Sequence, residues 1–371
     1  MRSVFLSLGA VLGLIAAAVL IVWIPGQSIK EEIIPVQEKQ EKKPEDLSGN
    51  GRFFRKIERP EKFELFYGWR DYRGNKYTAD FSISKRVLTD AFNEFGYRQD
   101  ECDAYVEDHL AGLREEMIAH LKKLTLAEMS GSPYGHYFYL EEKAKEEFNL
   151  RLSIPGSERN KYKEIKTEFV RITQKIAVEQ ELYFKKIEAE KENLAREFLE
   201  SRLLRFVDNK ISIQYKLCVE KNSPRVAVVL DTIRKSHPEI SLNEFLAIIL
   251  GFVQEIRYGL PPMEVDGKKI LEFWVPPLVL VNYLGDCDSK GVTFAAMWTA
   301  FKKYPLLLIK VPQHLFVGIA VPSFYGETLS VNGLRYSLCE VTGPNRLPPG
   351  VITPYSRSFL NIGRYRYELI H

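Results

Sequence analysis

The sequence has few cysteines and almost no excess of either charge. Four cysteines in 371 residues are too few for a disulfide scaffold of the kind that holds small secreted domains together. The 52 Lys+Arg residues exceed the 49 Asp+Glu residues by only 3, so the chain lacks the concentrated basic surface of a nucleic-acid-binding protein. An apolar content of 45% is enough for a packed core and excludes general disorder. We therefore predict folded domains and no nucleic-acid partner.

The one long uncharged run lies at the N-terminus. Residues 4–24 read VFLSLGAVLGLIAAAVLIVWI, which is long enough to cross a bilayer as a helix. A cleaved signal peptide is the alternative, with residues 16–18, all alanine, as the cleavage region. We favour an uncleaved anchor over residues 1–25, because the apolar run continues past the alanines until Pro25 ends it.

The next segment, residues 26–52, is charged and contains almost no aromatic residues, so we predict a tether that separates the folded part from the membrane. The short leader before the anchor favours a single-pass protein of the inner membrane with its bulk outside the cytoplasm. The same chain with its bulk on the cytoplasmic side is the alternative. A reporter fused to the C-terminus distinguishes the two orientations.

Residues 53–210 form the first predicted folded region. Residues 63–72 and 76–83 are aromatic and partly alternating, and the Arg-Gly-Asn turn between them predicts a β-hairpin. Helical patterns follow over 84–95 and 100–129.

Residues 157–222 contain neither glycine nor proline, and an apolar stripe along them predicts one long helix. A coiled-coil dimer or partner-binding arm is one interpretation of this stripe, and it implies self-association through the helix. We favour a helix that covers its own domain, because Glu179 and Glu190 interrupt the heptad pattern.

Residues 211–371 contain helical patterns followed by β patterns. Helices are expected over 224–236, 241–256 and 293–301, and the second begins with the capping box formed by Ser241 and Glu244. Residues 306–311, 314–321, 328–331 and 334–341 are rich in β-branched and aromatic residues and read as strands. Helices followed by an antiparallel sheet predict an α+β domain.

The strongest chemical signal is a cysteine where a glycine-containing turn enters a helix. Cys287 stands in the segment LGDCDSKG, and the positive end of a helix stabilises a thiolate, which is the nucleophilic form. His314 opens a β segment in the same region and can act as the base, and Glu340 on a later strand can orient the imidazole. Because side chains alternate along strands, neighbouring strands can present His314 and Glu340 side by side.

This order of residues resembles the transglutaminase-like cysteine enzymes. The resemblance rests on FVQEIRYG, LGDCDSKG, QHLFVGIAV and YSLCEVTGP, and it covers about residues 211–371. It implies a papain-like fold in which a helix carrying the cysteine packs on an antiparallel sheet carrying the histidine and the acid. It also implies that Cys287 is the nucleophile, His314 the base and Glu340 the orienting acid, with Glu in place of the more usual Asp.

Such a site transfers acyl groups. The Cys287 thiolate attacks an amide carbonyl, His314 protonates the leaving amine, and water or an amine then resolves the thioester. The oxyanion needs donors, and the Cys287 backbone N–H is one. Gln254 and Asn282 are the candidate side-chain donors upstream.

We predict no cofactor and no metal for this site. A calcium loop that began at DCDSKG would have Lys290 at its third acidic position and Met297 at position twelve, so we exclude one. No second cysteine or histidine lies at zinc-ligand spacing. Asp286 and Asp288 beside the cysteine oppose a thiolate, and we expect them to cap the helix.

The sequence thus predicts a membrane-anchored cysteine hydrolase or acyltransferase that acts on protein or cell-wall peptide amides outside the membrane. The alternative is a catalytically silent scaffold that uses the same domain and the long helix for assembly. On the outer side of a membrane, Cys102 and Cys218 could pair as a disulfide.

Overall fold

The computed structural model describes residues 51–144, 147–207, 210–301, 304–322, 326–343 and 346–370. The predicted anchor at 1–25 and almost all of the predicted tether at 26–52 lie outside the described residues. Within the described part of the chain, no helix is both long enough and apolar enough to cross a membrane.

The chain divides into two compact units. The first contains residues 103–195, and the second combines residues 51–102 with residues 196–370 in the described part. This division differs from the predicted boundary between 210 and 211, because the N-terminal strands belong to the same unit as the C-terminal sheet. Each unit is treated separately.

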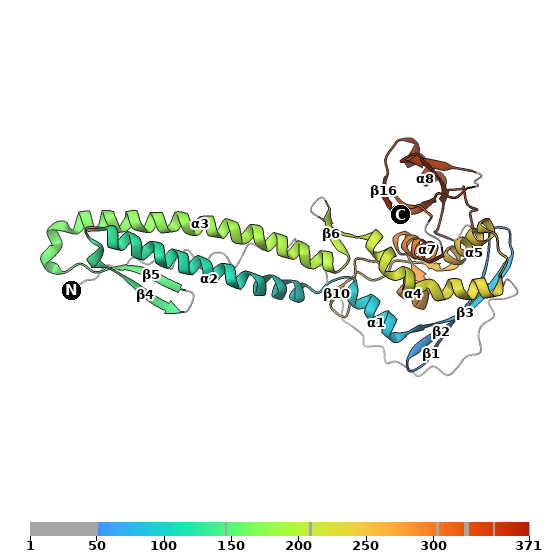
Figure 1. The fold of residues 1–371 in the computed structure, drawn as a ribbon, viewed down its shortest axis with the longest axis horizontal. Helices are drawn as coiled ribbons and strands as arrows, with labels where there is room; N and C mark the ends of the chain where they lie inside the picture. Colours follow the sequence, from blue (N-terminus) through green and yellow to red (C-terminus); the bar gives the residue numbers. More distant parts are fainter. Residues whose placement is uncertain are drawn as a thin grey trace, which may run out of the picture. The chain divides into compact units, whose positions relative to one another are not determined.

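The first unit is built on α2 (Gln99–Gly131) and α3 (Tyr162–Ser201), which lie side by side in Figure 1. Ion pairs between Lys175 and Glu128 and between Lys186 and Glu116 show that the two helices run antiparallel. The predicted apolar stripe of α3 is buried against α2 and the short hairpin. The hairpin and two 3-10 turns join the helices: η3 (Gly135–Tyr137), β4 (Phe138–Ala144), β5 (Glu147–Leu152) and η4 (Gly156–Lys161).

The burial of this stripe agrees with the favoured interpretation of a helix that covers its own unit. Its buried members in α3 are Ile165, Phe169, Ile172, Ile176, Ile187 and Leu194. Burying each such side chain contributes about 1.5–3 kcal/mol. Self-association through this helix stays a prediction.

The prediction of one helix over 157–222 is wrong, because α3 ends at Ser201. Leu203 has φ of 60°, a left-handed conformation that stops the helix without a glycine. A hairpin of β6 (Leu204–Val207) and β7 (Lys210–Ile213) follows. The absence of glycine and proline therefore did not ensure a continuous helix.

The prediction that the next helix begins at Pro224 is also wrong, because α4 spans Tyr215–Ser236 with the proline inside it. A proline removes one backbone hydrogen bond and pushes the preceding turn outward. The side chains of Asn222 and Ser223 donate to the carbonyl oxygens of Cys218 and Val219, at 2.8 Å each, in that turn. The helix α4 is therefore continuous through Pro224, and these two side-chain bonds lie in the turn before it.

The predicted hairpin of the second unit is confirmed and gains a third strand. The sheet has the order β1 (Phe53–Glu58), β2 (Lys62–Arg70), β3 (Lys76–Ser84). Ser84 caps α1 (Lys85–Glu94) by accepting from the backbone N–H of Val87. Trp69 is fully buried, and its indole N–H donates to the carbonyl oxygen of Ile248 in α5 (Leu242–Glu255). The small sheet thereby packs on the helices of the C-terminal part.

The predicted α+β arrangement with an antiparallel sheet is confirmed. The sheet order is β14 (Thr328–Val331), β15 (Leu334–Cys339), β13 (His314–Ile319), β12 (Leu306–Val311), β16 (Arg366–Leu369). The capping box of Ser241 and Glu244 at the start of α5 is present as predicted. The helices around the sheet include α6 (Pro276–Asn282), α7 (Cys287–Phe301) and α8 (Pro354–Asn361), and short strand pairs are β8 (Arg257–Tyr258) with β11 (Leu284–Gly285) and β9 (Glu264–Val265) with β10 (Lys268–Lys269).

The apolar sequence of α7 reflects its position, because this helix packs against β13 and β12 on one side and against α4, α5 and α6 on others. From Val292 to Trp298, every residue of α7 is fully buried. Figure 1 shows α7 next to α4 and α5. A cysteine at the first residue of this helix is therefore held on a buried element that is packed on several sides.

Candidate active site

Cys287 is the first residue of α7, six residues earlier than the helix start predicted at Thr293. Asp286 caps the helix: its Oδ1 atom accepts the backbone N–H of Ser289 at 2.8 Å, and its carbonyl oxygen accepts the N–H of Lys290 at 3.0 Å. The expected capping role of Asp286 is therefore present. β11 pairs with β8 directly before this turn and fixes where the chain enters the helix.

His314 is the first residue of β13, directly after a two-residue turn of Pro312 and Gln313. Val311 and His314 are paired across this turn. Proline suits the first central position of a type II turn, and Gln313 takes the left-handed conformation at the second, with φ of 58°. The tight turn sets the imidazole at the end of the strand pair.

His314 and Glu340 meet as the strand pattern predicted. The His314 Nε2 atom lies 2.9 Å from Glu340 Oε1, and the carboxylate is only 1% exposed. Thr342 donates to the same oxygen at 2.7 Å, and Ser356 donates to the other at 3.4 Å. A buried carboxylate with this many partners is held in one orientation, and it holds the imidazole ring in turn.

Cys287 lies near His314 because α7 packs against β13. The backbone N–H of Leu315, the residue after His314, is close enough to lower the pKa of the Cys287 thiol. Because Nε2 is used by Glu340, Nδ1 is the ring atom left for the thiol. In the described part of the chain, however, no hydrogen bond joins Cys287 Sγ to the imidazole. The thiol instead donates to Asp288 Oδ1 at 3.4 Å.

The electrostatics around Cys287 favour the protonated thiol, contrary to the thiolate expected from the helix terminus. Burial raises the pKa of Cys287, and the carboxylates of Asp288 and Asp286 raise it further. The Leu315 N–H lowers it, by a smaller amount. Burial and two adjacent acids thus outweigh the helix dipole.

Asp288 belongs to a polar cluster that the sequence did not reveal. Its Oδ2 atom accepts from the Tyr215 hydroxyl and from Lys310 Nζ, the latter at 3.0 Å. Lys310 also donates to the Tyr215 oxygen at 3.0 Å. Tyr215 is buried at the start of α4, while the Lys310 side chain on β12 is 50% exposed. These residues are distant in sequence, so no local pattern connected them.

The two candidate oxyanion donors differ in their surroundings. Gln254 is buried, and its amide nitrogen donates to the carbonyl oxygens of Glu340 and Leu347, at 2.7 and 3.0 Å. Both N–H groups are therefore occupied and hold the backbone at Glu340. Asn282 lies exposed at the end of α6. The backbone N–H of Cys287, in the first turn of α7 and outside the intrahelical ladder, is the better-placed donor.

The C-terminus of α5 connects α7 to the backbone of Glu340. Lys290 is fully buried in α7, and its ammonium donates to the carbonyl oxygen of Ile256 at 2.6 Å and to that of Gln254 at 3.4 Å. Gln254 in turn bonds the backbone of Glu340. Lys290 was missed, because it stands in the polar segment DCDSKG, where nothing in the sequence marks a lysine as buried.

The same segment of α5 carries a buried carboxylate with two cationic partners. Glu255 bonds Arg52 at 2.6 Å and Arg346 at 3.0 Å, and its side chain is 4% exposed. Together, Gln254, Glu255 and Ile256 fix the end of α5 to four other segments.

The atoms of Asp286, Cys287 and Asp288 lie within 4.8 Å of one another and could approach one cation. Asp286 is used as the helix cap and Asp288 as the acceptor of Lys310. A cation there would have to displace the lysine. We assign no metal to this cluster.

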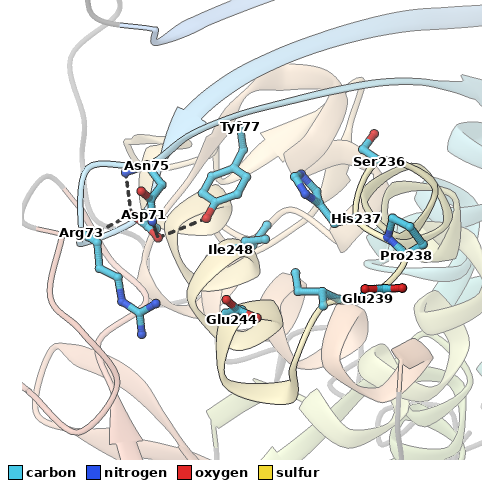
Figure 2. Close-up of a pocket in the computed structure, with 11 residues that line it drawn as sticks. Asp71, Arg73, Asn75, Tyr77, Ser236, His237, Pro238, Glu239, Glu244 and Ile248 are labelled. Atoms are coloured by element: carbon cyan, nitrogen blue, oxygen red, sulfur yellow. Dashed lines mark hydrogen bonds between the residues drawn. The ribbon is translucent and has the colours of Figure 1, made fainter.

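A pocket of about 410 Å³ lies elsewhere in the second unit and contains none of the three predicted site residues. It lies between the β2–β3 turn and the segment joining α4 to α5 (Figure 2). Its buried acid, Asp71, accepts from the backbone N–H groups of Arg73 and Asn75 and from the Tyr77 hydroxyl. These bonds shape the turn, and we assign no chemistry to this pocket.

The disulfide that Cys102 and Cys218 could form is not present, because all four cysteines are free and buried.

Comparison of the chain with protein-family models, with curated proteins and with solved structures yields no match.

The contact between α7 and β13 gives a first testable prediction. A Cβ atom at Gly291 would lie 2.2 Å from Leu315 Cδ2, and Leu315 is fully buried. Gly291→Ala should therefore lower the free energy of unfolding by about 2 kcal/mol, as overpacked cores do. Gly112→Ala on α2 is the matched control: a Cβ atom there meets nothing within 4 Å, so alanine should be neutral or stabilising. Urea titration measures both; equal effects would contradict the packing argument.

Proposed function

We propose that this protein is a cysteine enzyme of the transglutaminase-like type that hydrolyses or transfers the acyl group of amides. The observation that carries the proposal is the hydrogen bond between His314 and buried Glu340, with Cys287 at the start of the helix that packs on the histidine's strand. This arrangement supports the predicted roles of nucleophile, base and orienting acid.

The reaction begins from a thiol, because the surroundings of Cys287 favour its protonated form. As the sulfur attacks the amide carbon, the S–H bond breaks and the proton passes to His314 Nδ1. The C–S bond forms, and the carbonyl electrons move to the oxygen, where the Cys287 N–H stabilises the charge. Glu340 stabilises the imidazolium that results.

The second half of the reaction releases the acyl group. The imidazolium returns its proton to the leaving amine as the C–N bond breaks, which leaves a thioester. Water or a second amine then attacks the thioester carbon, His314 accepts its proton, and the sulfur leaves as a thiolate that His314 reprotonates. These steps need no cofactor. The sequence resemblance supports protein or cell-wall peptide amides as substrates.

Alkylation with iodoacetamide tests this proposal without knowledge of the substrate. In the folded full-length chain in detergent, we expect Cys287 to react faster than the other three cysteines. Cys218 and Cys339 are fully buried, whereas Cys287 is slightly exposed and has His314 nearby as a base. Peptide mapping by mass spectrometry measures the four rates. Equal, slow labelling of all four thiols would contradict an activated nucleophile.

The scaffold is the second candidate function, and exposed apolar residues on the first unit favour it. Val178 and Leu182 on α3 are 59% and 54% exposed. A Cys287→Ala chain expressed in cells lacking the native protein separates the two functions, because a scaffold tolerates this change and an enzyme does not. The membrane location proposed from residues 4–24 applies to both.

A further inference from the structure

The thiol of Cys287 can donate either to His314, the proposed base, or to Asp288. In the structure it donates to Asp288 Oδ1 at 3.4 Å, and Asp288 plays no part in the proposed reaction. Asp288 is the next residue of α7, so this contact forms without any change in the fold. Reaction with an amide requires the S–H group to leave the carboxylate and turn to the imidazole.

The other oxygen of Asp288 is held by two donors from other elements. Tyr215 of α4 and Lys310 of β12 both donate to Oδ2, and they also bond each other. The carboxylate is therefore fixed in place and partly neutralised by the lysine. Each donor that Asp288 gains makes its free oxygen a weaker acceptor for the thiol.

From this geometry we infer that Asp288 is a positioning residue that holds the Cys287 thiol away from His314, and that Lys310 and Tyr215 weaken this hold. The inference concerns regulation of the proposed site and therefore rests on the proposed function. Lys310 is half-exposed, so an anionic group that binds it would strengthen the carboxylate's hold on the thiol.

Other titratable groups also face the pair of Cys287 and Asp288. They are Asp286 before α7, Tyr215 from α4, Tyr258 from β8, Lys310 from β12 and His314 from β13. The two tyrosines have a raised pKa, burial being the largest cause, so both are neutral near pH 7. The two tyrosines therefore add no charge beside the thiol near pH 7.

The pH profile of Cys287 alkylation by iodoacetamide tests the inference in the full-length chain. Asp288→Asn removes the negative acceptor, so the rate at pH 7 should rise about tenfold and the profile should move to lower pH. Lys310→Met leaves the carboxylate without its cation, so the rate should fall several-fold and the profile should move to higher pH. Tyr215→Phe should act in the same direction as Lys310→Met.

Opposite signs distinguish this role from a merely structural one, because general damage to the site slows alkylation in every variant. A slower rate in Asp288→Asn would overturn the inference. If that variant does not fold, unchanged rates in both Lys310→Met and Tyr215→Phe would overturn it. In the double variant Asp288→Asn, Lys310→Met, the effect of losing the lysine should disappear, since it acts through the carboxylate. The proposed function fails on different evidence, namely when removal of His314 does not change alkylation.

Discussion

His314→Ala should slow the alkylation of Cys287 by iodoacetamide about a hundredfold at pH 7. The thiol is surrounded by groups that favour its protonated form, so it depends on a base to lose its proton. General bases contribute about 10²–10⁴ to such steps. Samples quenched at successive times, with the alkylated fraction of the Cys287 peptide measured by mass spectrometry, give the rate.

His237→Ala is the matched control for this variant. His237 belongs to the same unit, but it packs edge-on against Tyr77 in the pocket of Figure 2 and has no role in the proposed chemistry. Its removal should leave the alkylation rate unchanged. Added imidazole should restore part of the rate to His314→Ala. A His314→Ala protein that folds and is alkylated at the normal rate would refute the assignment of the base.

Lys290→Met should abolish a rise of about 3 kcal/mol that the wild-type free energy of unfolding shows between pH 8 and 10.5. Burial lowers the pKa of Lys290 from an ordinary 10.5 to about 8. Between pH 8 and 10.5 the unfolded chain binds a proton at this lysine and the folded chain does not, so the wild-type free energy of unfolding rises with pH. A shift of this size corresponds to about 3 kcal/mol. The variant lacks the group and should lack this rise.

The measurement is the difference in the free energy of unfolding, wild type minus Lys290→Met, from urea titrations at pH 7 to 10.5. The difference should be constant below pH 8 and increase up to pH 10.5. Tyrosines and other groups titrate in both proteins and cancel in the difference. A difference that stays flat over this range would show that Lys290 carries its charge in the folded state without penalty.

The local elements were largely predictable because their signals lie within a few residues. Ser241 and Glu244 form the predicted capping box, and the alternating segments around residues 63–83 form the predicted hairpin. Helix boundaries were less predictable. The left-handed residue that ends α3 is Leu203, which no rule selects, and Pro224 lies within α4, where Asn222 and Ser223 bond the preceding turn.

The candidate site shows the same limit. His314 and Glu340 could be placed side by side from strand alternation alone, because side chains that share a face lie close on neighbouring strands. Gln254 could not be judged in this way. Its amide N–H groups bond the backbone of Glu340 and Leu347, which lie far along the chain.

The sequence by itself determined the elements, the α+β class and the order of cysteine, histidine and acid, since periodicity, capping and alternation are local properties. Only the tertiary structure decided which polar atoms meet. It brought Lys290 to the end of α5, and Tyr215 and Lys310 to Asp288. These contacts depend on packing between distant segments, and the charge state of a nucleophile depends on every group packed around it.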